Sequence, residues 1–406
     1  MAPNSQLLVA KPVRLVRMIV AAVLMRLTVD TTTRMFYPFL PEISRGLGIS
    51  LAQGGLLMSL RSSMIFLSPI FGAYTDRRGA RNLLAVALIV QAGGLLWLSS
   101  ATGFATAVPP ILMLGLASSA FIPNLQAAVS ERVAFERRGR VLGIIEFSWA
   151  ITGLVILPII GVVMTLQGWQ APLRVIALCS LAAAPLAFLL PSQRRPLAAL
   201  RTGLRRSATV VLRSTSARGG IIVNGLMFVA AETFFVTYGA WMEQSFGMRP
   251  DQVGRIAAAL GFAELIASTT SSLFIDRIGK RRGVGIGLVG MAVFMATLPL
   301  AGSLLPLAVA AMFLFTIFFE FSIVSNIGLM SEQVPTMRGT VLSLSAMASG
   351  VVRAGSATAG AALFEWRGIT AATVFGVAGS LLAAFVLFRW VKERGDMPPA
   401  GEVASV

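Results

Sequence analysis

The chain has 406 residues, of which 56% are hydrophobic and only 13% are charged. Soluble domains carry about 25% charged residues, so this composition excludes a soluble enzyme of this length and favours a membrane protein. The net charge of +17 lies in short clusters between long apolar runs, which is typical of the cytoplasmic loops of membrane proteins and not of a nucleic-acid-binding surface.

Long apolar segments predict an all-α membrane protein, because a membrane-spanning helix needs about 20 mostly apolar residues. The first segment follows Lys11, Arg14 and Arg17 and has no small-residue cleavage pattern, so we expect a first spanning helix and not a removed signal peptide. In chain order, about twelve spans are predicted, with centres near Val29, Met64, Val90, Ala117, Leu154, Leu181, Ala230, Leu265, Ala292, Phe315, Val352 and Ala378.

One basic segment divides these spans six and six. Ser192–Gly219 carries seven arginines and no acidic residue. We therefore expect an N-terminal six-helix bundle in residues 1–191, a basic cytoplasmic linker in residues 192–219, and a C-terminal six-helix bundle with a short cytoplasmic tail in residues 220–406.

The basic residues also predict the orientation in the membrane. With the N-terminus in the cytoplasm, the cytoplasmic segments hold 25 of the 34 lysines and arginines, and the other face holds 5. Because basic residues concentrate in cytoplasmic loops, both termini and the central linker are expected in the cytoplasm. The chain is expected to be an integral protein of the plasma membrane, typically a bacterial inner membrane.

The two halves repeat each other at an offset of 200 residues. Asp76-Arg77-Arg78-Gly79 recurs as Asp276-Arg277-Ile278-Gly279, and Arg138-Gly139-Arg140 recurs in part as Arg338-Gly339-Thr340. Six spans per half is an even number, so both halves begin on the same side of the membrane. Transporters built from such repeats place their substrate between the halves, near the bilayer midplane.

The segment Gly72–Arg81 resembles the loop signature G-x-x-x-D-R-x-G-x-R of the major facilitator superfamily, and the second copy keeps its core. The resemblance implies a secondary transporter with two pseudo-symmetric six-helix bundles. We expect Gly72 to allow close helix contact and Gly79 to permit a tight turn. Asp76 should face the helix start near Gly339–Val341, and Asp276 the one near Gly139–Val141. The expected conformational latch comprises Gly72, Asp76, Arg77, Gly79, Arg81, Asp276, Arg277 and Gly279.

Span five carries a partial match to a second motif. Gly153, Pro158 and Gly161 fit the antiporter motif G-x-x-x-G-P-x-x-G-G of the same superfamily, whereas Leu157 and Val162 depart from it. This favours a drug–proton antiporter. Span four offers only neutral residues over Gly115–Pro123, without the arginine that such antiporters usually carry.

Charged residues inside the spans are the strongest functional pointers, because a charge in the bilayer is costly unless it is paired or hydrated. The candidate proton-coupling acids are Asp30, Glu232, Glu264 and Glu320, with Asp30 favoured. The candidate charge partners or substrate contacts are Arg26, Arg34, Arg61, Arg353 and Tyr37. Asp30 is expected to pair with Arg61, with Arg26 and Arg34 as competing partners.

Together these features predict proton-coupled efflux of small hydrophobic or amphiphilic compounds by alternating access. The alternative is proton symport or uniport of a nutrient or organic anion. A membrane-embedded enzyme or sensor is a remote alternative, because the chain has no histidine, a single cysteine (Cys179) and no metal-ligand cluster. The expected partners are a small-molecule substrate and membrane lipid, with no nucleic acid, no cofactor and a functional monomer driven by the proton gradient.

Overall fold

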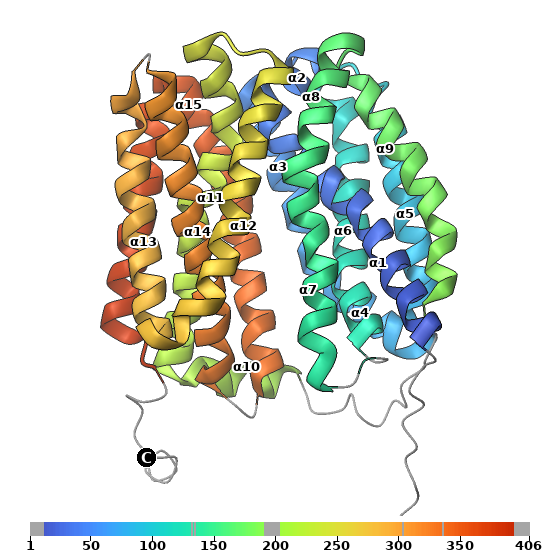
Figure 1. Cartoon of the computed structure of the whole chain (residues 1–406), viewed down its shortest axis with the longest axis vertical. Helices are drawn as coiled ribbons and strands as arrows, with labels where there is room; N and C mark the ends of the chain where they lie inside the picture. The colour runs from blue at the N-terminus through green and yellow to red at the C-terminus, as the bar shows by residue number, and fades with distance from the viewer. Residues whose placement is uncertain are drawn as a thin grey trace, which may run out of the picture.

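The computed structural model describes residues 12–130, 133, 135–190, 204–302, 304–334 and 337–393, which are helical almost throughout and contain no strand. The helices of the first half stand side by side in Figure 1. In chain order they are α1 (Pro12–Arg34), α2 (Phe36–Leu47), α3 (Leu51–Ser63), the 3₁₀ turn η1 (Met64–Leu67), α4 (Ser68–Arg78), α5 (Ala80–Leu98), α6 (Phe104–Ser130), α7 (Phe135–Ile151), the π-helical turn η2 (Thr152–Ile156), α8 (Leu157–Gln167), α9 (Gln170–Ala183) and the 3₁₀ turn η3 (Ala184–Leu189).

The second half packs beside the first and continues the pattern. It contains α10 (Leu204–Arg213), α11 (Thr215–Phe246), α12 (Pro250–Ile278), α13 (Lys280–Thr297), the 3₁₀ turn η5 (Pro299–Ala301), α14 (Leu305–Gln333) and α15 (Arg338–Trp390). Arg367 and Gly368 have non-helical backbone angles, so α15 is two helices joined at a sharp bend.

Ten helical segments of the described residues are long and apolar enough to cross a membrane, from Leu51–Thr75 to Arg338–Trp390. When α1–α2 is counted as a further span and α15 as two, the described chain has twelve spans. The predicted all-α fold is therefore confirmed. The first part of the predicted central linker, residues 192–203, lies outside the described residues, and the rest of it forms α10 and the first residues of α11.

Two glycines of the repeat separate consecutive spans in the same way. Gly79 lies between α4 and α5 with φ 82° and ψ 160°, and Gly279 lies between α12 and α13 with φ 89° and ψ 138°. A side chain rarely tolerates this backbone region. The expected tight turn at Gly79 is thus present, and its copy adopts a similar conformation.

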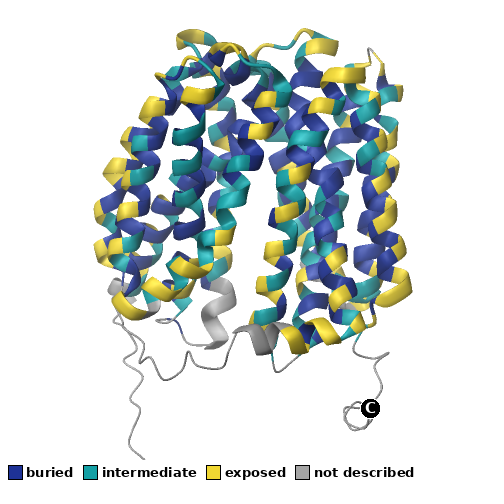
Figure 2. Ribbon diagram, turned by 180° about the vertical axis from the view of Figure 1, so that it is seen from behind, coloured by how far each residue is buried: buried dark blue, intermediate teal, exposed yellow. Residues whose placement is uncertain are grey.

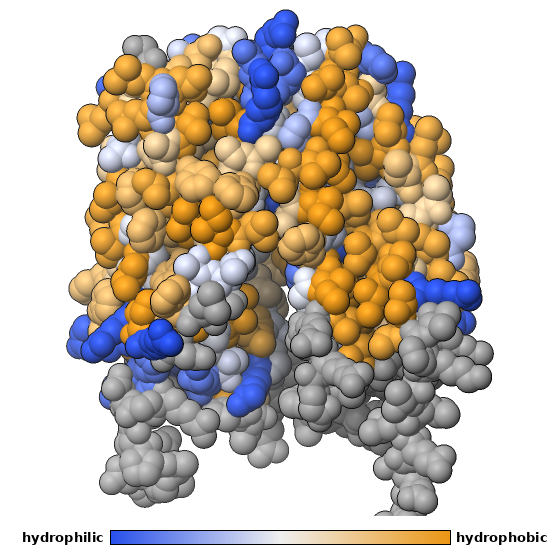
Figure 3. Space-filling view, in the orientation of Figure 1, coloured by the Kyte–Doolittle hydropathy of each residue, from blue (hydrophilic) through white to orange (hydrophobic). Residues whose placement is uncertain are grey.

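The outer surface of the molecule is apolar around its middle. Figure 2 shows that buried residues line the interior of each half, and Figure 3 shows apolar side chains across the visible flank. Large apolar side chains are exposed on several helices, including Ile70, Leu178, Val374 and Phe385. A belt of this size needs a lipid environment.

The two halves meet closely at the end opposite to the start of α1 and the end of α15. Glycines there let backbones touch: a Cβ at Gly55 would lie 2.6 Å from the Ala357 carbonyl oxygen, and one at Gly239 would overlap the Pro38 carbonyl. Towards the end that carries the termini, the halves diverge, and Figure 3 shows a hollow between them.

Candidate substrate and proton site

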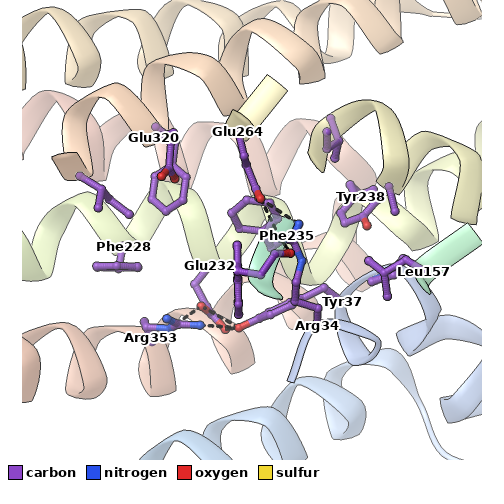
Figure 4. Close-up of a pocket in the computed structure, with 16 residues that line it drawn as sticks. Arg34, Tyr37, Leu157, Phe228, Glu232, Phe235, Tyr238, Glu264, Glu320 and Arg353 are labelled. Atoms are coloured by element: carbon purple, nitrogen blue, oxygen red, sulfur yellow. Dashed lines mark hydrogen bonds and ion pairs between the residues drawn. The ribbon is translucent and has the colours of Figure 1, made fainter. Parts of the chain in front are cut away.

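A cavity lies between the two halves at the middle of the molecule. It contains about 770 Å³ of empty space, part of it open to solvent. Charged and aromatic side chains dominate its wall (Figure 4). The lining residues are Arg34, Tyr37, Pro38, Trp149, Leu157, Phe228, Glu232, Phe235, Tyr238, Ala257, Leu260, Glu264, Phe319, Glu320, Ile323 and Arg353.

One polar cluster in this wall is built around Tyr37. The Arg353 guanidinium forms an ion pair with Glu232 at 2.9 Å and donates a hydrogen bond to the Tyr37 hydroxyl at 2.5 Å. The hydroxyl in turn donates to Glu232 at 3.1 Å. Tyr37 comes from the first half and the other two residues come from the second, so the cluster joins the halves.

Arg61 lies behind this cluster and adds a second positive charge. It is buried, donates a hydrogen bond to the Thr33 carbonyl at 3.3 Å, and lies 5.3 Å from the centre of the Phe36 ring. It interacts electrostatically with Tyr37, Arg353 and Glu232 but has no ion-pair partner among the described residues. The cluster therefore contains two arginines and one glutamate.

A second cluster contains more acidic than basic side chains. Both guanidinium Nη atoms of Arg34 donate to Glu264, at 2.7 and 3.0 Å, and the guanidinium lies 4.5 Å from the centre of the Trp149 ring. Glu320 lies close enough to both charged groups to interact with them electrostatically. Its hydrogen bond is to the Ser268 hydroxyl at 2.8 Å, and no cation pairs with it in the described part of the chain.

A glycine makes room for Arg34. A Cβ at Gly153, within the π-helical turn η2, would lie 3.0 Å from Arg34 Nη2. On the opposite side of this turn, a Cβ at Gly261 of α12 would lie 3.0 Å from Gly153 backbone. Gly153 thus makes room for Arg34 to reach across to Glu264, and Gly261 allows α12 to approach the turn.

Asp30 belongs to a third cluster, which lies inside the first half and does not line the cavity; Asp30 and Arg26 are buried, whereas Glu146 is partly exposed. Arg26 pairs with Asp30 at 2.8 Å and with Glu146 at 3.0 Å, and the Ser148 hydroxyl donates to Asp30 at 2.6 Å. Of the three arginines considered for Asp30, the structure selects Arg26. The expected Asp30–Arg61 pair is wrong, because Arg61 lies with Tyr37 and Arg353.

Phe228 and Phe319 of the cavity wall, and Ser268 beside Glu320, were not predicted from the sequence. Phe228 precedes Glu232 by one helical turn, so helical spacing from that acid predicts it on the same face. Phe319 directly precedes Glu320, and helical spacing from that acid does not single it out. Ser268 lies four residues after Glu264, so helical spacing predicts it on the same face as that acid.

The comparisons with known proteins agree with this architecture. The model of the Major Facilitator Superfamily matches residues 22–238 and again residues 220–404, so nearly the whole chain is covered by two matches. The chain belongs to the Major Facilitator Superfamily. It is an integral membrane transporter and not an enzyme.

Relatives within this superfamily are distant and diverse. The chain is 24% identical over 232 residues to a putative niacin/nicotinamide transporter, NiaP, of Bacillus subtilis, a match that covers 55% of this chain and 57% of that protein. It is 23% identical over 334 residues to an uncharacterized transporter, YwfA, of the same organism, with 80% of each chain covered. The crystal structure of a D-xylose–proton symporter superposes with a TM-score of 0.78 at 16% identity, covering 94% of this chain and 99% of that one.

The superfamily loop signature lies at the end that carries the termini. Arg81 donates to the Leu190 carbonyl, while Arg77 and Arg277 are exposed. The side chains of Asp76 and Asp276 lie outside the described residues, so their latch role stays a prediction. Among the described residues the expected close contact at Gly72 is absent: a Cβ there would meet no described atom within 4 Å, because the halves diverge at this end.

The partial antiporter motif of this superfamily protein lies against α12. A Cβ at Gly161 would overlap the Pro250 carbonyl, and one at Gly254 would lie 3.0 Å from Pro158. Together with Gly153, these residues form a close backbone contact between the two halves. The structure thus gives the motif a packing role at this interface.

Proposed function

We propose that this chain is a proton-coupled secondary transporter that exports small amphiphilic compounds by alternating access. The observation that carries the proposal is Glu320, a carboxylate in the wall of the central cavity that has a hydroxyl partner and no cation among the described residues. The mixture of charged and aromatic residues around it suits a compound with both apolar and polar parts.

Glu320 can exchange a proton without breaking an ion pair. Protonation of Glu232 or Glu264 would leave Arg353 or Arg34 without its counter-charge, and breaking a buried pair in this way costs about 3–5 kcal/mol. Protonation of Glu320 instead breaks no ion pair among the described residues. A group of this kind can bind a proton in one conformation and release it in another as its surroundings change.

Asp30 remains a second candidate for proton coupling. Arg26 faces two acids, Asp30 and Glu146, so one negative charge in that cluster is in excess. However, Asp30 does not line the cavity, so a substrate there could influence it only through the helix that carries it.

Alternating access is supported by the uneven contacts between the halves. At the end opposite to the termini, Arg45 pairs with Glu243, and the Ala52 N–H donates to Glu365 at 3.1 Å. In the described residues, the hydrogen bonds and ion pairs that join the halves lie at this end or at the level of the cavity. The cavity is therefore closed on one side, and we propose that this side is external.

Import of a nutrient or organic anion is the second candidate. The excess positive charge of Arg61 and Arg353 in the Tyr37 cluster favours it. The relative named a putative niacin/nicotinamide transporter and the structural neighbour named a D-xylose–proton symporter also favour it. The antiporter-type residues Gly153, Pro158 and Gly161 favour export.

We further propose that the transporter lies in a bacterial inner membrane as a monomer, with both termini in the cytoplasm. The basic residues at the termini-carrying end would then contact anionic lipid. We propose that the proton gradient supplies the energy and that no cofactor, metal or nucleic acid takes part.

The test uses proteoliposomes that contain the dye pyranine and an imposed proton gradient, with ethidium as an amphiphilic cation and benzoate as an organic anion. Wild-type protein should move protons when one of the two probes is added, and the direction of accumulation separates export from import. Glu320→Gln should retain exchange of that probe between the two sides but lose its accumulation.

The control variant is Glu42→Gln, at the end of the molecule opposite to the termini. It should accumulate the probe normally, because Arg45 keeps its contact with Glu243. Accumulation by Glu320→Gln would contradict the assignment, and loss by Asp30→Asn alone would transfer it to Asp30.

A further inference from the structure

The charges around the cavity are balanced overall but separated in space. Arg61 and Arg353 outnumber Glu232 on one side, and Glu264 and Glu320 outnumber Arg34 on the other. Figure 4 shows Glu320 and Arg353 at different edges of the cavity, with Phe228 between them. The cavity thus has one basic pole and one acidic pole, each with one uncompensated charge.

We infer that this cavity binds a dipolar aromatic substrate, with its cationic group at Glu320 and its anionic group at Arg353. The inference rests on the proposed function, because it treats the cavity as the transport site. It narrows that function from amphiphilic compounds in general to compounds that carry a positive and a negative group on an aromatic frame.

The acidic pole has a free acceptor. Both oxygens of Glu264 are occupied by Arg34, at 2.7 and 3.0 Å. Glu320 accepts the Ser268 hydroxyl through Oε1, and its Oε2 has no hydrogen-bond donor among the described residues. A substrate ammonium or protonated ring nitrogen can therefore donate to Glu320 Oε2 without displacing an existing partner.

The basic pole has a free donor. Arg353 uses Nε for Glu232 and Nη2 for Tyr37, whereas its Nη1 has no hydrogen-bond partner in the described part of the chain. The Arg353 side chain is 32% exposed, and Arg61 behind it is not neutralised by an acid. A substrate carboxylate can bind at Nη1 and compensate the extra positive charge.

An aromatic wall connects the two poles. The ring centres of Tyr37 and Phe235 lie 5.8 Å apart, those of Phe235 and Phe319 lie 5.5 Å apart, and those of Phe319 and Phe228 lie 5.9 Å apart. The Phe228 ring lies 5.2 Å from the Arg353 guanidinium carbon, and Figure 4 shows this ring between Arg353 and Glu320. A flat aromatic frame can pack against them while its two charged ends reach Glu320 and Arg353.

A ligand with a single charge would leave one pole unmatched. Burial of a charge without a partner is unfavourable, so a singly charged ligand gains at one pole and leaves the other uncompensated when it displaces water. A dipolar ligand compensates both poles and adds no net charge to the cavity. The two separated poles therefore favour a dipolar substrate over a simple organic anion or cation.

Calorimetric titration of the purified protein tests the inference without a proton gradient, so its outcome is independent of whether transport is proton-coupled. The probes share one frame: 4-(aminomethyl)benzoate carries both charges, 4-methylbenzylamine only the positive one, and 4-methylbenzoate only the negative one. Phenylalanine tests a shorter separation of the charges. We expect at least one of the two dipolar probes to bind about tenfold or more tightly than both singly charged probes.

Two variants should shift this preference in opposite directions. Glu320→Gln removes the excess negative charge and should favour 4-methylbenzoate, whereas Arg61→Met removes the excess positive charge and should favour 4-methylbenzylamine. Neither variant separates an ion pair, and Glu42→Gln, far from the cavity, should keep the wild-type order. Equal or tighter binding of a singly charged probe to the wild type, or no binding of any dipolar probe, would overturn the inference. So would an unchanged order in both variants.

Discussion

Arg34 of α1 and Glu264 of α12 form a two-pronged ion pair that joins the halves of the transporter at the level of the cavity. Both side chains are buried, with exposed fractions of 7% and 8%. A pair that is removed from water in this way is costly to break, because each charge left alone loses both its partner and its hydration.

Glu264→Gln should therefore destabilise the observed conformation by about 3–5 kcal/mol, since Arg34 is left buried without a counter-charge. We expect a clear fall in the melting temperature of the purified protein. The double variant Arg34→Met/Glu264→Met should recover most of this loss, because neither charge then remains. A double variant as unstable as the single one would show that the pair is not the cause.

Gly153 should be needed for the position of Arg34. The larger side chain of Gly153→Val would overlap the Arg34 guanidinium, and overpacking of this kind costs about 1–3 kcal/mol. We expect reduced transport and a lower melting temperature. Gly143→Val in the same span is the matched control, because a Cβ at Gly143 meets no atom within 4 Å. Similar losses in both variants would point to helix propensity and not to Arg34.

Glu365 should help to close the end opposite to the termini. Its carboxylate accepts hydrogen bonds from the Ala52 N–H at 3.1 Å and the Ser50 hydroxyl at 3.3 Å, at the start of α3, where a negative charge is favourable. Glu365→Ala should shift the population towards a conformation open at this end.

Labelling can detect that shift. In a Cys179→Ser background, a cysteine introduced at Ala257, which lines the cavity, should react several-fold faster with an impermeant maleimide added from this end once Glu365→Ala is present. Gln53 still caps α3 through the Ser50 N–H, so the helix itself should remain intact. An unchanged labelling rate would exclude a closing role for Glu365.

The two glycines of the loop signature should respond differently to substitution. Gly79→Ala forces a side chain into a backbone region that costs about 1–3 kcal/mol, whereas Gly72→Ala places a methyl group in open space. The melting temperature of Gly79→Ala should therefore be lower than that of Gly72→Ala. Equal stability would mean that the turn at Gly79 relaxes when the residue is replaced.

Much of the fold was predictable because local patterns determine it. The length of each apolar segment determines where a spanning helix lies, because a backbone can cross lipid only as a helix or as part of a closed barrel. The repeat that places Gly79 and Gly279 at the same turn predicted two related halves. The motif residues of span five were found as well, although the sequence did not show that Gly153 accommodates Arg34.

The partners of the charged residues were harder to predict. The expected Asp30–Arg61 pair assumed similar depth from a count of residues along each span, yet the structure pairs Asp30 with Arg26, one helical turn away. Depth along a span is a one-dimensional quantity, and it does not report which face of a helix turns towards which neighbour.

The sequence by itself determined that the chain spans a membrane as two repeated sets of helices and that a few charged residues lie within them. These properties follow from apolar length, spacing and residue type, which need no knowledge of packing. Only the tertiary structure decided that Arg34 pairs with Glu264, that Arg353 pairs with Glu232, and that Glu320 has no cation among the described residues. Ion pairing depends on side-chain positions from helices far apart in the chain, and those positions are set when the two halves pack together.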